Sequence, residues 1–70
     1  MKHAIQVLNE ALSVELIALE QCTQQYDAFR QAGIHRWKNY ASTWMDILHR
    51  MALAENRKRD ILRALDVLNN

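Results

Sequence analysis

Apolar residues recur along the chain at alternating spacings of three and four, the pattern of an amphipathic helix. In the first half these positions are Ile5, Leu8, Leu12, Leu19, Cys22, Tyr26 and Phe29. In the second half the main seam is Trp37, Ala41, Trp44, Leu48, Met51, Leu62 and Leu65, broadened on one side by Tyr40, Ile47, Ala54, Ile61 and Leu68. A period near seven predicts two helices with left-handed supercoiling, as in a coiled coil.

Gly33 is the strongest helix breaker in the chain, which has one glycine and no proline. Glycine readily adopts the left-handed conformation that ends many helices. We therefore predict one all-α domain over residues 1–70, an antiparallel two-helix hairpin. Its helices should span about residues 2–31 and about residues 35–68, joined by a turn at about 32–34. A turn this short makes the two helices antiparallel.

Two amphipathic helices that face only each other leave apolar surface uncovered, and a chain of 70 residues forms only a small core. A twofold dimer would cover that surface by forming a four-helix bundle. The alternative is a monomer that forms half of a bundle with a different protein. The predicted dimer core consists of Leu12, Leu19, Trp37, Trp44, Leu48, Met51 and Leu62.

Three charged residues interrupt the seams. Glu15 stands where the first helix calls for an apolar residue, and Glu55 and Lys58 do so in the second. In an antiparallel hairpin all three lie at one height. A buried carboxylate is costly unless it is paired, so we expect Lys58 to pair with Glu15 in a buried polar layer that fixes the register. The alternative is a pocket for a ligand or a partner side chain.

A second apolar stripe on the first helix points away from the main seam and is a candidate interface. Alternatively, a broad four-helix core covers this stripe. Two arginines seven residues apart add a positive edge on the second helix. The predicted partner-binding residues are Val7, Glu10, Val14, Ile17, Arg50 and Arg57. The turn region, rich in aromatic residues and arginine, is the second-choice contact surface.

Composition excludes several classes of protein. Cys22 is the only cysteine, so no disulfide forms within the chain, and a lone thiol suits a reducing compartment. No apolar run is longer than that of Leu16–Leu19, which is too short to span a bilayer, and the N-terminal residues do not resemble a secretory signal. We therefore expect a cytoplasmic protein without membrane contact. A net charge of +1 does not favour nucleic acid as a partner.

The sequence contains no serine–histidine–acid grouping and no glycine-rich phosphate loop, so we do not expect an enzyme. Its three histidines, His3, His35 and His49, are scattered and expected to be solvated. No metal site or cofactor is predicted from these residues.

One segment nevertheless resembles the first helix of bacterioferritin: Leu8–Leu12, followed by Val14–Leu16 and Gln21. That resemblance implies a ferritin-like metal-binding hairpin in which Glu15 is an iron ligand. The second iron helix of that family carries glutamate and histidine three residues apart. Here Lys58 follows Glu55 at that spacing, and an ammonium group cannot bind a metal.

In its length, its hairpin form and its lack of catalytic groups, the chain resembles the tiny early proteins of bacteriophages. Among these it is most similar to the anti-activator family that binds quorum-sensing regulators of the LuxR type. The resemblance implies a homodimer in the host cytoplasm that inhibits a larger host protein, such as a transcription regulator. It assigns no binding residue. An alternative is the two-helix co-chaperone of type III secretion, which pairs with a larger helical-repeat chaperone.

Overall fold

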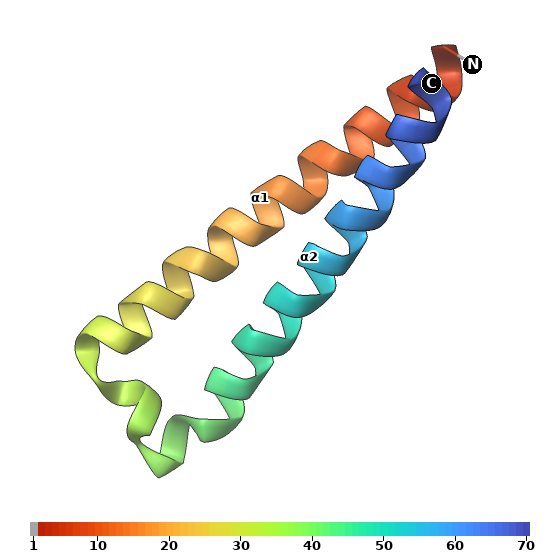
Figure 1. Cartoon of the computed structure of the whole chain (residues 1–70). Coiled ribbons are helices and arrows are strands. Elements are labelled where there is room, and N and C mark those ends of the chain that lie inside the picture. The colour runs from red at the N-terminus through yellow and green to blue at the C-terminus, as the bar shows by residue number, and fades with distance from the viewer. Residues whose placement is uncertain (1) are drawn as a thin grey trace.

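The computed structural model describes residues 2–70 as two long helices and a turn. The order is α1 (Lys2–Ala32), η1 (Ile34–Arg36), η2 (Lys38–Tyr40) and α2 (Ala41–Asn69). Figure 1 shows α1 and α2 running antiparallel, with both ends of the chain together and the turn at the far end. The predicted all-helical hairpin is therefore confirmed, and residues 2–70 contain no strand.

Helix α1 runs without interruption because residues 2–32 contain neither glycine nor proline. It ends at Gly33, whose φ of 73° lies in the left-handed region. The Gly33 N–H donates a hydrogen bond of 3.1 Å to the carbonyl of Arg30. The Arg30 side chain also lies in the last turn, where a cation favours the negative end of the helix dipole.

The turn is longer than predicted, because α2 begins at Ala41 rather than near residue 35. Two short 3-10 turns flank Trp37, which has an extended backbone with φ −78° and ψ 129°. The Trp37 N–H donates to the Ile34 carbonyl at 3.0 Å, and the Tyr40 N–H donates to the Trp37 carbonyl at 3.0 Å. The axes of packed helices are about 8–10 Å apart. After Gly33 ends α1, the chain must cross this distance before α2 can begin.

The two helices pack along one seam. In α1 it follows the predicted positions, and Cys22 is buried there. In α2 the predicted centre of the seam is wrong. The residues buried against α1 include Ile47, at 1% exposure, and Ala54, at 4%, both of which were expected only to broaden the apolar stripe. Leu62, expected in the centre, is 45% exposed. The α2 seam is centred on Trp44, Ile47, Met51, Ala54, Lys58, Ile61, Leu65 and Leu68, and Leu48 is half-buried at its edge.

The molecule is a rod of 49 × 14 × 14 Å. Its radius of gyration is 15.6 Å, whereas a compact domain of this length would have about 11 Å. The core is therefore a single line of contacts between two helices, without a third layer to cover their outer faces. Within residues 2–70, neither helix has a segment with the length and hydropathy needed to cross a membrane.

Candidate protein-interaction surfaces

Apolar side chains are distributed unusually between core and surface. Among residues 2–70, four apolar residues are buried, whereas ten large apolar side chains are 39–70% exposed. The exposed ones are Val7, Val14, Leu16, Ile17, Trp37, Tyr40, Met45, Leu53, Leu62 and Val67. Isolated exposed apolar residues are ordinary, but this many on a small hairpin leave surface that another chain could cover.

Helix α1 carries an apolar line beside its buried seam. Val7 is 47% exposed, Val14 64% and Ile17 57%. Alanines extend this line because residues 4, 7, 11, 14 and 18 follow the three-and-four spacing of one helical face. Small side chains at alternate positions would allow another helix to approach closely. We call Ala4, Val7, Ala11, Val14, Ile17 and Ala18 the α1 apolar line.

A groove of about 230 Å³ lies between the two helices, next to the α1 apolar line. It is lined by Glu15, Ala18, Gln21, Cys22 and Gln25 from α1 and by Arg50, Leu53, Ala54 and Arg57 from α2. Val14 lies one turn from Ala18, and Ile17 lies one turn from Gln21, so both border the groove.

The predicted partner-binding residues therefore fall into two groups. Val14, Ile17, Arg50 and Arg57 lie at or beside the groove. Val7 and Glu10 are also exposed, but they lie further toward the end of the rod that holds the chain termini.

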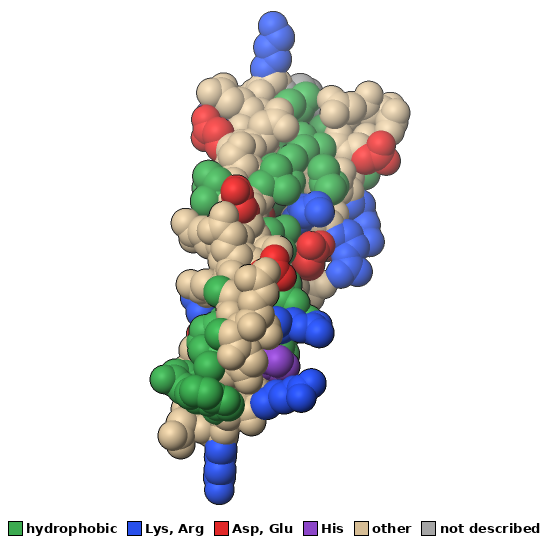
Figure 2. Space-filling model, turned by 90° about the vertical axis from the view of Figure 1, so that its left-hand side faces the viewer, with side chains coloured by type: hydrophobic (Ala, Val, Ile, Leu, Met, Phe, Trp, Pro, Cys, Tyr) green, Lys and Arg blue, Asp and Glu red, His purple; other side chains and the backbone are tan. Residues whose placement is uncertain are grey.

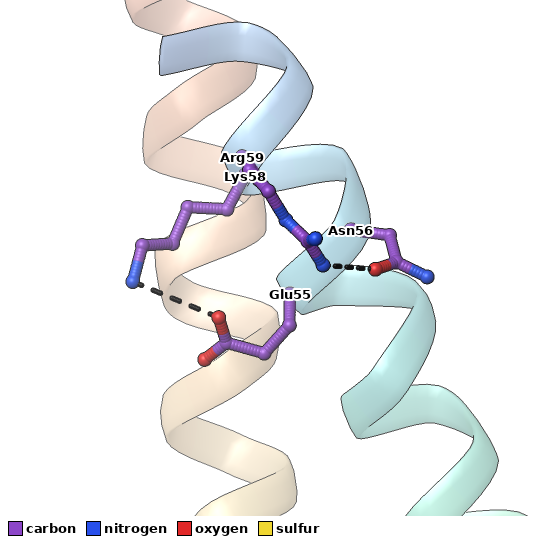
Figure 3. Close-up of polar contacts among 4 residues, drawn as sticks. All are labelled: Glu55, Asn56, Lys58 and Arg59. Carbon is purple, nitrogen blue, oxygen red and sulfur yellow. Dashed lines mark hydrogen bonds and ion pairs between the residues drawn. The ribbon is translucent and has the colours of Figure 1, made fainter. Parts of the chain in front are cut away.

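The predicted buried polar layer is wrong in its pairing, and of its three residues only Glu15, with a side chain 14% exposed, is largely buried. The Glu15 carboxylate forms its ion pair with Arg57, at 3.8 Å, and not with Lys58. The Lys58 ammonium pairs instead with Glu55 at 3.9 Å, within α2 (Figure 3). The Glu55 side chain is 57% exposed, so it belongs to the surface. The long stem of Lys58 lets it occupy a seam position while its charge reaches solvent.

The positive edge predicted on α2 is partly neutralised. Arg50 forms an ion pair of 3.0 Å with Asp46, one turn before it. Arg59 donates a hydrogen bond to the side-chain oxygen of Asn56 (Figure 3). These partners are well exposed, and exposed ion pairs stabilise a fold by only about 0–1 kcal/mol. Their main effect is to intersperse the two signs of charge along this helix.

An aromatic cluster joins the two helices at the turn. Tyr26 stacks on Trp44 with ring centroids 4.9 Å apart, and Phe29 lies 6.3 Å from the same indole. His35 packs 5.3 Å from Trp44 and is half-buried, so its expected solvation is wrong. Its Nδ1 is buried and has no hydrogen-bond partner within residues 2–70. The cluster was visible in the sequence only as a high density of aromatic residues.

Trp37 and Tyr40 form the exposed side of this cluster. Trp37, predicted in the helical seam, is 56% exposed, and its ring lies 5.9 Å from that of Tyr40. Arg30 donates a hydrogen bond of 3.0 Å to the Tyr26 hydroxyl and lies 5.7 Å from the centre of its ring. This hydrogen bond raises the pKa of Arg30 above its ordinary value.

The ferritin-like alternative finds no support in this geometry. Residues 2–70 contain no group of three or more histidine, cysteine or carboxylate side chains that could hold a metal ion. The charged side chain paired with Glu15 is that of Arg57, a cation that would oppose a metal there.

Comparison with family profiles, with curated proteins and with solved structures gave no match for this chain.

Proposed function

We propose that the chain is a non-enzymatic protein-interaction module that completes its apolar core against another polypeptide, in the first place a second copy of itself. One observation carries the proposal: in the described part of the chain, residues 2–70, four apolar residues are buried whereas ten large apolar side chains are exposed. Fully burying one aliphatic side chain contributes about 1.5–3 kcal/mol. These side chains are 39–70% exposed, so covering two or three of them would add on the order of a few kcal/mol, a sizeable share of the stability of a small domain.

The α1 apolar line and the adjacent groove are the surface we assign to this contact. A second helix laid along the groove would cover Val14 and Ile17 and would meet Arg50 and Arg57. Charge supports a copy of the chain as the occupant. Helix α1 has two basic and four acidic residues, whereas α2 has five basic and four acidic ones. The α1 of one copy would therefore be attracted to the α2 of the other.

The narrower form of the proposal concerns the final partner. We propose a larger host regulatory protein, such as a LuxR-type transcription factor that a phage-type anti-activator would block. Length and hairpin form support this resemblance. Copurification of the tagged chain with such a regulator tests it, and absence of copurification would remove this partner. A homodimer that is stable alone would count against the alternative of a secretion co-chaperone, which depends on its larger partner.

Analytical ultracentrifugation tests the proposed dimer and its surface together. The wild-type chain should sediment as a dimer at micromolar concentration. Val14→Glu combined with Ile17→Glu should shift it to a monomer, because two carboxylates would have to be desolvated in the contact.

The matched control is Met45→Glu with Ala52→Glu, which adds the same charge at exposed positions of α2 outside the groove. This control should remain dimeric. A wild-type chain that is monomeric and fully helical at every concentration would contradict the proposal, and dissociation of the control alone would place the contact on the opposite side.

A further inference from the structure

The end of the hairpin has a different chemistry from its long faces. Between Asp27 and Asp46 the chain has no acidic residue, but it contains three exposed cations, Arg30, Arg36 and Lys38. On the face shown in Figure 2, acidic side chains lie in the upper part, and the lower end, where the turn lies, shows lysine or arginine side chains but no acidic ones. By contrast, Arg50, Arg57 and Lys58 each have a carboxylate within 4 Å.

The same turn segment carries two exposed aromatic residues. Trp37 is 56% exposed and Tyr40 is 40% exposed. The Trp37 backbone lies between two hydrogen-bonded 3-10 turns, which define the position from which the indole projects. Phe29 supports Tyr40 from behind, edge to face, with ring centroids 6.1 Å apart. A rigid platform of this kind loses little conformational entropy on binding.

We propose that this tip, made of Arg30, Arg36, Trp37, Lys38 and Tyr40, is a second docking surface, which recognises an acidic segment of a partner protein. The inference rests on the proposed function as an interaction module, but it concerns a separate surface. Trp37 would insert among apolar side chains of the partner, and the three cations would pair with its carboxylates. Tryptophan, tyrosine and arginine are the residues that most often dominate binding energy at protein interfaces.

The number of charges favours a protein over the other polyanions. Basic segments that bind anionic membranes typically carry about four to eight clustered cations. Specific DNA-binding proteins often contact about six to ten phosphates. The tip has three cations. Arginine also matches a carboxylate with two parallel hydrogen bonds, which gives a short acidic segment geometric specificity.

The position of the tip makes it independent of the proposed dimer contact. It lies at the end of the rod opposite the termini, whereas the α1 apolar line runs along the side of α1 (Figure 1). A dimer formed along the groove would leave the tip accessible. Loss of peptide binding at the tip can therefore be measured separately from loss of dimerisation through the groove.

The test uses a fluorescein-labelled peptide of alternating acidic residues, leucine and phenylalanine, titrated with the full chain by fluorescence anisotropy. Binding should be saturable and should weaken as salt is added. Trp37→Ala should weaken it at least tenfold, as should Arg36→Glu combined with Lys38→Glu. The control, Lys2→Glu with Arg59→Glu, makes the same charge change away from the tip and should alter the affinity less than twofold.

Three results would overturn the inference: no saturable binding of the peptide, an equal loss in the control variant, or tip-dependent binding that is tighter to oligothymidylate or to phosphatidylserine vesicles. Circular dichroism confirms that each variant is still helical. Sedimentation of the same variants separates the two proposals, because a tip variant that still dimerises has lost only the second surface.

Discussion

At the scale of single residues, Glu15 is the least expected feature of the hairpin. It occupies a seam position, its side chain is 14% exposed, and its partner Arg57 is 65% exposed. Because the arginine remains largely in water, its attraction to Glu15 offsets little of the desolvation free energy of the buried carboxylate. The charge is thus tolerated at this position, and its contribution to stability is small.

Replacing Glu15 by leucine should therefore stabilise the hairpin, by about 1–2 kcal/mol, because an apolar side chain restores the seam and leaves Arg57 free in solvent. Urea unfolding followed by circular dichroism measures the change. Glu20→Leu, on the exposed side of α1, is the control and should change stability by less than about 0.5 kcal/mol. A destabilised Glu15→Leu variant would show that the carboxylate has a role beyond this ion pair.

At the scale of elements, the reversal of the chain depends on where α1 ends. Gly33 has a left-handed backbone, with φ of 73°, and a Cβ placed on it would meet no atom within 4 Å. Any penalty for a side chain at this position is consequently one of backbone conformation and not of space.

Gly33→Ala should cost about 1–2 kcal/mol, the usual penalty of a left-handed conformation for a residue with a Cβ. Gly33→Asn should cost less, because asparagine tolerates this conformation better. Thermal unfolding of the two variants gives the comparison. Equal stabilities for Gly33→Ala and the wild type would mean that the turn relaxes to another backbone path.

At the scale of the whole molecule, a rod two helices thick buries only a narrow core between its helices. A chain that completes its core by association should become more stable as its concentration rises. A chain that folds alone should unfold at the same temperature at every concentration.

We accordingly expect the melting temperature to increase with protein concentration. Over a hundredfold range of concentration, mass action can raise the free energy of unfolding by up to about 2.7 kcal/mol. Differential scanning calorimetry or circular dichroism can record it. In the Val14→Glu, Ile17→Glu double variant the dependence should disappear. A constant melting temperature for the wild type would contradict self-association as the source of stability.

Several residues at the groove could be predicted from the sequence, whereas the arrangement of the tip could not. Val14 and Ile17 were expected on an exposed stripe because their spacing departs from the main seam. The pairing of Glu15 with Arg57 could not be predicted. Arg57 and Lys58 are adjacent in the sequence and lie at the same height along the hairpin, so only the rotation of α2 about its axis decides which of them faces Glu15. Trp37 was misplaced because no breaker follows Gly33 to mark the delayed start of α2.

The formation of two antiparallel helices follows from local features of the sequence. Apolar spacing and helix-forming residues act locally, and the single glycine marks where α1 ends. Packing between the helices decided which side of α2 faces α1, since Ile47 and Leu48 both fit a helical stripe. It also decided where the second helix starts, because that depends on the distance the chain must cross and on the packing of aromatic rings from both helices.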